Sequence, residues 1–558
     1  MKLLFLISTL TFLSAGAYSQ SWMGRTMQWS RAGARPFASP EMRVYIDSVG
    51  GDPTGMMPSD DAVLTAISMA GSEGVTIVFG RGRYLLRRPI ALPSNTTLQG
   101  QGATSTVLSF EGIGSVDCIR IQGGIRRAIY PLVRGFERGD SLLYFDGGVM
   151  EPGDLLRVVI NDTDLVYSDW AIGSVGQVVQ VRSSIGQGTI LDVPLRLGAS
   201  IDRNPRCLVL LPVEQVRIRC LGIQRDDSTA QQTANIRIVN ARDVMIDGVR
   251  SSKTNFGHVV IESSARVTVT RSDFSESYGY GGGGRGYGVV CQYTASDCRI
   301  EDNIFSDLRH SMLMQAGANG NVFAYNASKN ARWTEFPNDA AGDVVFHGNW
   351  VFGNLVEGND VCHIVVDNSH GANGWFNTIL RNRSREYGLY MGGSPFADST
   401  MIMGNEIPNT GLIKGLFITG GKGLVNIGNI VKGKLTPPEL SMVPPPSFLY
   451  ASRPAGYQGN IWPPYGAMDP LQRDTIPARI RQIISKITCP CTEDFPTTVR
   501  ERASQHDPLE NIERVVAINV LGQQVFAGTP AEFALWRADY NILAKQISSV
   551  TLTVLTGR

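Results

Sequence analysis

Two short segments of the sequence carry histidine and aspartate at matching positions. Asp343 and His347 are four residues apart in one segment, and His363 and Asp367 are four apart, in the opposite order, in the other. Neighbouring parallel strands lie about 4.8 Å apart, so in this arrangement His347 faces Asp367 and His363 faces Asp343. An aspartate can tune a neighbouring histidine for proton transfer near neutral pH. The spacing predicts two candidate catalytic pairs, with solvated ion pairs of small energy as the alternative.

Other side chains with useful chemistry surround these pairs. Tyr390 lies one segment further along, between the two pairs, and is a candidate acid. The candidate substrate-binding residues are Gln315, which precedes His347 in the same column, Arg309 and His310 in a turn over the same face, Asn368 and His370 in the loop after Asp367, and Arg383. Arginine suits anionic groups, although a turn-forming or solubilising role is the alternative for these residues. Residues four apart in a strand are separated by roughly 13 Å, which is too far for both pairs to bind one metal ion.

The elements that would position these residues form a repeat. Eight six-residue segments end at positions 249, 272, 303, 326, 359, 382, 405 and 429, and six of the eight end in Asn. The spacings are 23 or 24 residues, except for two longer ones that contain the insertions at 278–286 and 329–341. A period near 23 residues with short strands predicts a solenoid of β-coils. Stacked Asn side chains would then bond the backbone of buried turns and each other.

A second strand follows each of these segments, and its side chains alternate between two faces. One face is apolar throughout and is predicted to be the interior, with pairs such as Val344 and Phe346, or Leu416 and Ile418. The opposite face carries the histidines and aspartates described above and is predicted to face water.

These repeats resemble the β-helix of the pectate-lyase superfamily. The beginning of the chain has the same resemblance, with Gly51-Asp52-Pro53-Thr54-Gly55, an amphipathic stretch from Asp60, and the strand Thr76–Phe79. The resemblance implies an all-β chain that folds as a single-stranded right-handed parallel β-helix over about residues 40–435. It also implies an N-terminal cap helix and a strand-rich excursion at about 130–210.

Both ends of the sequence read as separate segments. Residues 1–20 carry Lys2, an apolar run and a small-residue stretch, which is typical of a signal peptide and predicts a secreted or cell-surface protein. Residues 436–500 read as a Pro-rich wrap-around segment or linker, and residues 501–558 as a small C-terminal domain. The stretch 512–526 resembles part of a type IX secretion sorting domain, which implies bacterial secretion machinery as a partner. A small β-rich cap is the alternative.

Composition excludes several classes of protein. No other apolar run approaches the roughly 18 residues of a membrane span. A formal charge of +1 argues against duplex nucleic acid as a partner, which favours a strongly basic surface.

The resemblance implies an enzyme acting on a polysaccharide. Elimination at a uronic acid needs donors for its carboxylate, a base and an acid. Arg309, Asn368 and Arg383 are candidates for the first role, and the histidines for the base. Asp343 and Asp367 are expected about 14 Å apart, wider than inverting hydrolysis requires, so a lyase is predicted ahead of a glycoside hydrolase. Calcium is a candidate cofactor through the resemblance, although no clear acidic cluster is seen. A non-catalytic carbohydrate-binding surface with Trp333, Trp350, Trp375 or Tyr390 as platforms is the further alternative.

Overall fold

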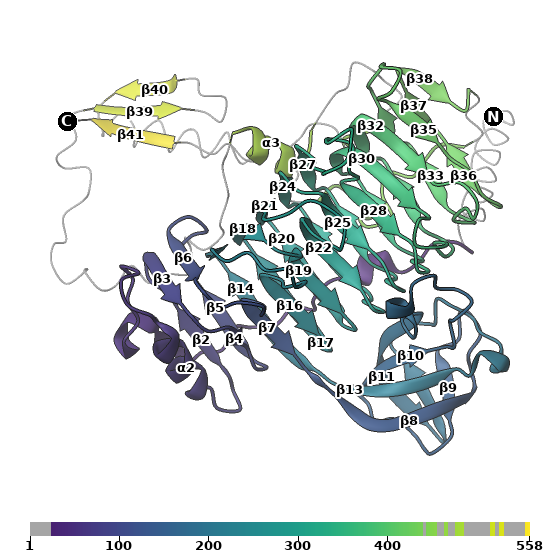
Figure 1. The fold of residues 1–558 in the computed structure, drawn as a ribbon, viewed down its shortest axis with the longest axis horizontal. Coiled ribbons are helices and arrows are strands. Elements are labelled where there is room, and N and C mark those ends of the chain that lie inside the picture. Colours follow the sequence, from purple (N-terminus) through teal and green to yellow (C-terminus); the bar gives the residue numbers. More distant parts are fainter. Residues whose placement is uncertain are drawn as a thin grey trace, which may run out of the picture. The chain divides into compact units, whose positions relative to one another are not determined.

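The computed structural model describes residues 24–438, 442–454, 462–466 and 475–484, and the backbone of three strands beyond them. The chain divides into two compact units, Met1–Thr492 and Glu493–Arg558. The first unit is a parallel β-helix, which confirms the predicted fold class (Figure 1). The predicted signal peptide lies outside the described residues. Within the described part of the chain, no helix has both the length and the apolar character needed to cross a membrane.

Each complete coil contributes strands to three parallel ladders. The first ladder is a 12-stranded sheet. Its strands are β1 (Arg43–Tyr45), β2 (Val75–Val78), β5 (Thr96–Gln99), β14 (Val213–Arg219), β17 (Ala241–Asp247), β20 (Ala265–Thr270), β23 (Arg299–Glu301), β26 (Val322–Ala324), β29 (Leu355–Glu357), β31 (Thr378–Leu380), β33 (Met401–Met403) and β36 (Val425–Ile427).

The other two ladders join into a 20-stranded sheet. The second ladder contains β3 (Gly82–Leu86), β6 (Thr106–Phe110), β15 (Gly222–Arg225), β18 (Arg250–Thr254), β21 (Asp273–Ser277), β24 (Ile304–Ser306), β27 (Ala327–Lys329), β30 (Asp360–Asp367), β32 (Arg383–Met391), β34 (Glu406–Ile407) and β37 (Asn429–Val431). The third contains β4 (Ile90–Ala91), β7 (Ile119–Gln122), β16 (Ile236–Val239), β19 (Gly257–Glu262), β22 (Tyr287–Gln292), β25 (His310–Met314), β28 (Val344–His347) and β35 (Leu416–Ile418), and β30 and β32 run through both. A final strand, β38 (Lys434–Thr436), pairs antiparallel with β37.

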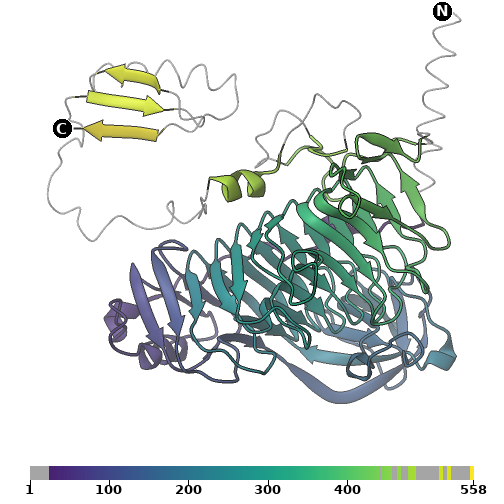
Figure 2. The same cartoon turned by 45° about the horizontal axis from the view of Figure 1, so that its top comes forward.

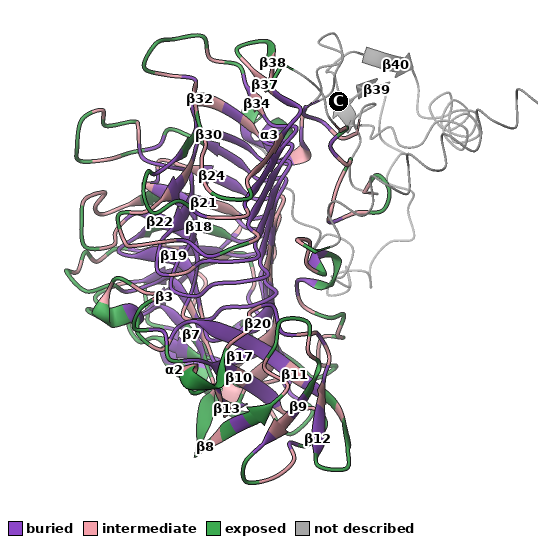
Figure 3. Ribbon diagram, turned by 90° about the vertical axis from the view of Figure 1, so that its right-hand side faces the viewer, coloured by how far each residue is buried: buried purple, intermediate pink, exposed green. Residues whose placement is uncertain are grey.

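The interior is filled by alternate residues of these strands, as the repeat predicts. In the first ladder Ile300, Phe323, Val356 and Ile379 are register partners on successive coils and belong to one buried core. In Figure 2 the colour changes from purple to green along the stack, because successive coils follow the sequence. Figure 3 shows the buried residues along the stacked strands and the exposed ones mainly in loops.

The predicted asparagine ladder is confirmed. Each amide nitrogen of Asn303, Asn326, Asn359, Asn382 and Asn405 donates to the side-chain oxygen of the next asparagine at 2.9–3.0 Å, and the series ends at Asn429. All six side chains are buried. A second ladder runs from Asn321 through Asn354 to Asn377 at another turn of the coil. The recurrent spacing thus records a physical stack of amides along the axis of the β-helix.

One register expectation is wrong. Leu389, which faces the interior, pairs with Phe417, so Phe417 takes the inward position on β35 and Leu416 and Ile418 do not. Phe417 is only half-buried because the stack is ending. A one-residue shift reverses both faces of a strand, and the apolar run Leu416–Ile418 does not reveal which register is used.

A helix and a barrel interrupt the repeat. Helix α2 (Asp60–Ser68) packs Ala62, Val63 and Ala66 against the core, as the cap-helix expectation requires. The strand-rich excursion is a closed antiparallel barrel. Its strands are β8 (Gly124–Arg134), β9 (Leu142–Phe145), β10 (Leu155–Val159), β11 (Gly176–Ile185), β12 (Gly188–Leu191) and β13 (Arg206–Leu211). The barrel has its own apolar core, which includes Leu143, Leu156 and Val209. The described residues of this unit also form short 3₁₀ helices, η1 (Trp29–Arg31), η2 (Ile46–Val49), η3 (Asp169–Ala171) and η4 (Ile201–Arg203).

The described parts of the wrap-around segment pack on the β-helix. Ser447 and the Phe448 amide bind Glu357, and α3 (Pro477–Ile483) places Arg479 against Asp360 at 2.9 Å. The second unit contains a three-stranded antiparallel sheet in the order β40 (Gln524–Gly528), β39 (Arg514–Ile518), β41 (Thr553–Gly557). The sorting-domain resemblance stays a prediction.

Candidate functional site

The sequence analysis expects the outer face of the third ladder to be open to water, and this expectation is wrong. Val260, Val290, Leu313 and Val345 lie on that face, yet they are buried in a separate apolar cluster with Phe256. The longer loops cover the coils here, and alternation along a strand cannot report such cover. The site is therefore a bounded pocket rather than an open groove.

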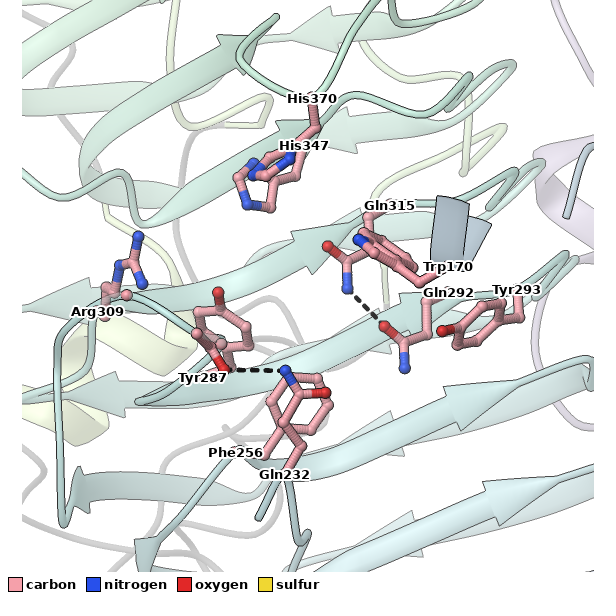
Figure 4. Close-up of a pocket in the computed structure, with 13 residues that line it drawn as sticks. Trp170, Gln232, Phe256, Tyr287, Gln292, Tyr293, Arg309, Gln315, His347 and His370 are labelled. Carbon is pink, nitrogen blue, oxygen red and sulfur yellow. Dashed lines mark hydrogen bonds between the residues drawn. The ribbon is translucent and has the colours of Figure 1, made fainter. Parts of the chain in front are cut away.

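The pocket has a volume of about 570 Å³, which is within the usual range for ligand sites. It lies over the ends of β22, β25 and β28, and Figure 4 shows its side chains converging from several elements. The lining residues are Trp170, Gln232, Phe256, Gly282, Gly283, Gly284, Tyr287, Gln292, Tyr293, Arg309, Gln315, His347 and His370.

His347 and Asp367 form the closest polar pair at the pocket. His347 follows Phe346 at the end of β28 and is the register partner of Asp367 on β30, as the sequence predicts. Nδ1 of His347 donates to Oδ2 of Asp367 at 2.6 Å. Partial burial favours a higher pKa for Asp367, but the bond from His347, its charge and two bonds from Ser369 hold this pKa below its usual range. Asp367 is thus ionised, and its bond with Nδ1 orients the His347 ring.

Two more histidine rings pack against His347. His370 meets it edge-on, with 4.5 Å between ring centroids, and His310 lies 5.8 Å away. Burial, followed by the charge of His347, lowers the pKa of His370. Burial also lowers the pKa of His310, whose Nδ1 donates to the Gly342 carbonyl at 2.8 Å. His310 does not line the pocket but supports the ring of Tyr287, 5.1 Å away. The structure brings the three histidines together, although only two reach the cavity.

Arg309 supplies the positive charge at the pocket. Its Nη1 donates to the Gly281 carbonyl at 2.5 Å, and its guanidinium lies 6.0 Å from the ring centre of Tyr287. Among the described residues, Arg309 forms no ion pair with a carboxylate, and its Nε is buried without a hydrogen-bond partner. An arginine in this state suits an anionic ligand, which would replace the missing counter-charge.

Tyr287 places a phenol beside this arginine. Its side chain is almost fully buried, and burial raises its pKa above the ordinary value of 10, so the hydroxyl is protonated at neutral pH. In Figure 4 the hydroxyl points to the side of the pocket where His347 lies.

Two amides continue the polar surface of the pocket. Gln315 donates to Gln292 at 2.5 Å, and Gln292 donates to Glu262 at 2.6 Å. Gln315 lies one position beyond Met314, the register partner of Phe346, so it neighbours His347 as predicted. These amides offer hydrogen bonds to hydroxyl groups of a ligand.

An aromatic wall faces the histidines. Trp170 on η3 comes from the barrel and meets Tyr293 edge-on, with ring centroids 5.9 Å apart. Glycines of the insertion at 278–286 form another wall of the pocket. Gln232 donates to the Gly283 carbonyl at 2.9 Å, and Gly283 has a φ of +79°. Such a left-handed backbone favours glycine.

The second predicted pair is arranged differently. Asp343 accepts hydrogen bonds from the amides of Cys362 and His363 and from Ser328, instead of from the imidazole of His363. Burial raises the pKa of Asp343. The His363 ring donates to the Ala340 carbonyl at 3.1 Å, and burial lowers its pKa. Asp343 and His363 are therefore register neighbours, but their side chains bond other partners instead of each other. Asp343 is also completely buried and does not reach a cavity.

Three other predicted residues lie outside the pocket lining. Tyr390 is exposed and pairs in register with Val365. Asn368 ties a turn together by donating to the carbonyls of Gly393 and Ser394. Arg383 pairs with Glu406 at 2.8 Å and lies over the Tyr465 ring, on the side of the coil that the wrap-around segment covers. Their predicted roles stay predictions.

Several pocket residues escape the sequence analysis. Trp170 is distant in sequence and belongs to the barrel, so no repeat position marks it. Tyr287 and Gln292 both lie on β22. Gln292 occupies the same position as Gln315 on the preceding coil, so the repeat could have identified it. Among the described residues, no group of three or more His, Cys, Asp or Glu is arranged to hold a metal ion, and the calcium expectation stays a prediction.

Comparison with known proteins finds similar solved structures only at low sequence identity. No family model matches the sequence, and no curated protein does. The tailspike of Pseudomonas phage phi297 is 14% identical over 68% of this chain and 73% of its own, with a TM-score of 0.48. A tailspike of Acinetobacter baumannii bacteriophage AP22, solved with capsular saccharide, is 10% identical over 69% of each chain, with a TM-score of 0.41. An exopolygalacturonase from Thermotoga maritima is 11% identical over 67% of this chain and 88% of its own, with a TM-score of 0.31. The parallel strand pairing described above defines the fold of this chain.

Proposed function

We propose that the protein is a polysaccharide lyase that cleaves a uronic-acid-containing chain by β-elimination in the pocket. The observation that carries this proposal is the presence, in one cavity, of an arginine without a carboxylate partner and a histidine oriented by a carboxylate. Arg309 would bind the uronate carboxylate, and His347 would act as the base.

The elimination can be written with these groups. Nε2 of His347 takes the proton from the carbon next to the carboxylate, C5. The electron pair of that bond forms the C4–C5 double bond, and the C4–O bond to the neighbouring sugar breaks. The positive charge of Arg309 stabilises the negative charge that develops on the carboxylate during proton removal.

Tyr287 is the acid that this proposal assigns to the departing oxygen. Its hydroxyl lines the pocket and is protonated at neutral pH, so it can donate a proton to the leaving group. Tyr390, the candidate from the sequence, does not line the pocket. His347 then loses its proton and Tyr287 regains one, either by transfer between them or through solvent. Both residues are thereby back in their starting protonation states.

Hydrolysis is the second candidate, and the pocket supports it less well. Glycosidases ordinarily use a pair of carboxyl groups beside the scissile bond, one of them as the acid. Of the described residues that line the pocket, none carries a carboxyl group, and Asp367 bonds His347 without lining the cavity. Non-catalytic binding is the third candidate, and the aromatic wall of Trp170 and Tyr293 favours it.

One experiment separates the three candidates. Purified protein is incubated with polygalacturonate, alginate, chondroitin sulfate and dextran, and both reducing ends and ultraviolet absorbance are followed. A lyase gives new reducing ends together with absorbance from the double bond, and it spares the neutral dextran. Reducing ends without absorbance would establish a hydrolase instead, and retention of a polymer without cleavage would establish a binder.

We also propose export, because residues 1–20 have the features of a signal peptide. The partner in this step would be bacterial secretion machinery if the sorting-domain resemblance holds. Sequencing the N-terminus of secreted protein tests the first point, and an intact Met1 on cytoplasmic protein would contradict it.

A further inference from the structure

Three exposed aromatic side chains lie on the two loops that contribute Trp170 and His370 to the pocket. Tyr167 is 72% exposed, Trp170 44% and Trp375 41%. We call these three residues the aromatic ridge. Large exposed aromatic side chains that lie next to one another mark binding surfaces more often than isolated ones do. The ridge is shared between two modules, because Tyr167 and Trp170 belong to the barrel and Trp375 to a turn of the β-helix.

The ridge is continuous with the pocket. Trp170 lines the pocket, and Tyr167 precedes it by three residues in the same loop. Tyr167 lies against Gly371, where a Cβ atom would come within 2.7 Å of the tyrosine Cβ, and the preceding residue, His370, lines the pocket. Trp375 follows four residues later and packs edge-on against Trp350, with ring centroids 5.5 Å apart. The aromatic surface therefore begins at the histidine end of the cavity.

The barrel loop that carries the ridge is held in place. Both carboxylate oxygens of the buried Asp162 accept loop amides, from Gly173 at 2.8 Å and Val175 at 2.9 Å. The side-chain oxygen of Asn349, on the β-helix, accepts the amides of Tyr167 and Ser168 at 2.8 and 3.0 Å. Such anchoring fixes the position of exposed rings and lowers the entropic cost of binding.

We propose that the aromatic ridge binds sugar residues of the polysaccharide beyond the one that reacts, which rests on the pocket being the site proposed above. A cavity of about 570 Å³ holds a limited stretch of a polymer, so the rest of the chain must lie on the adjoining surface. Flat aromatic rings offer large apolar contact area at little entropic cost and match the apolar faces of pyranose rings. The barrel is thereby a substrate-binding module, and the ridge selects for chain length.

The test uses the double variant Tyr167→Ala/Trp375→Ala, which leaves the lining of the pocket unchanged. The matched control is Tyr45→Ala, because Tyr45 is 46% exposed and lies on β1 in the first coil. On polygalacturonate or alginate, whichever is cleaved, the double variant should raise KM about 5- to 50-fold with little change in kcat. On the shortest oligosaccharide that is cleaved, the variant and the wild type should agree. An equal rise in KM on long and short substrates, or no rise on either, would overturn the proposal that the ridge binds the polymer.

A binding measurement keeps this inference separate from the proposed chemistry. In a His347→Ala background, affinity electrophoresis in gels containing polygalacturonate or alginate reports polymer binding without turnover. Weaker retention of the ridge variant than of the Tyr45→Ala control supports the ridge, even if the wild type cleaves nothing and the lyase proposal fails. Retention that is undetectable in both, or equal in both, refutes the ridge even if cleavage is observed.

Discussion

At the scale of single residues, the pocket gathers groups whose protonation states are set by their neighbours. Asp367 is held ionised by His347 and Ser369, and Tyr287 is held protonated by burial. Burial likewise disfavours the charged form of His370. The result is a histidine oriented by a carboxylate beside a protonated phenol, with Arg309 as the cation.

Replacing the base should abolish most of the activity. We expect His347→Ala to reduce kcat about 10²-fold or more on a uronate polymer, because His347 is the pocket histidine whose ring is oriented by a carboxylate. The free energy of unfolding should change by about 1 kcal/mol, the usual value of one hydrogen bond. Initial rates and urea unfolding measure the two effects. Activity within twofold of the wild type would remove His347 from the mechanism.

The acid can be tested by a matched pair of phenylalanine variants. Tyr287→Phe should lower kcat by about 10²-fold, whereas Tyr390→Phe, outside the pocket, should not. Both changes remove one hydroxyl group, so the ring packing is retained in each. If the Tyr390 variant is the impaired one, the assignment of the acid must be exchanged.

His258 should make folding sensitive to acid. Its ring is fully buried, with Nδ1 bonded to Ser251 at 2.8 Å, and burial lowers its pKa to about 3. Below its ordinary pKa of about 6.5, the unfolded chain binds a proton that the folded chain does not, so stability falls as pH decreases towards 3. Other groups titrate too, so the quantity to measure is the difference in Tm between the wild type and His258→Gln from pH 7 to 4. This difference should shift in favour of the variant as pH falls, and a constant difference would contradict the assignment.

At the scale of elements, the asparagine ladder is a main polar feature of the coil. Each of its amides bonds both the next amide and the backbone of a neighbouring coil. Asn382, for example, donates to the Val356 carbonyl at 2.9 Å, and its own side-chain oxygen accepts the Asn359 amide. The repeat in the sequence exists because each coil must satisfy the same backbone groups.

Breaking this ladder should destabilise the β-helix without touching the pocket. Asn382→Leu leaves buried donors and acceptors without partners, and we expect a loss of about 1–3 kcal/mol in the free energy of unfolding. Asn338→Leu is the control, because Asn338 is exposed in a loop. Denaturant titration of both variants measures the difference. Equal stability of the two would mean that the ladder contributes nothing.

The sequence predicts the coils better than it predicts the site. Asn303 to Asn429 and the buried Val344 and Phe346 are periodic, so their positions could be anticipated. The second ladder is missed where β24 and β27 have only three residues, because so short a strand leaves no pattern. His347 and Asp367 were found because they share a register. Trp170 was missed because its place in the pocket depends on how the barrel docks, which no local pattern records.

At the scale of the whole molecule, the residues proposed for catalysis all belong to the first of the two units. The pocket lies entirely within Met1–Thr492, and its lining runs from Trp170 to His370. The described parts of the wrap-around segment also belong to this first unit and supply bonds to Glu357 and Asp360.

Removing the second unit should therefore leave activity intact. A chain ending at Thr492 is expected to keep the kcat and KM of the full chain on its polysaccharide, whereas one ending at 440 should lose stability, because the buried Glu357 and Asp360 lose partners. Thermal unfolding and initial rates test both chains. A folded chain ending at Thr492 without activity would show that the second unit takes part in catalysis.

The barrel leaves and rejoins the β-helix at a single point. Gly124, at its beginning, pairs with Leu211, at its end, and the chain passes from β13 to β14 within two residues. A short turn could bridge this gap, so the barrel has the geometry of a cassette. Recombination could exchange such an insert in one event. The side of the pocket that the barrel supplies through Trp170 would then change, and the β-helix would stay unaltered. Selectivity for different polymers could then evolve faster than the β-helix that carries the proposed catalytic residues.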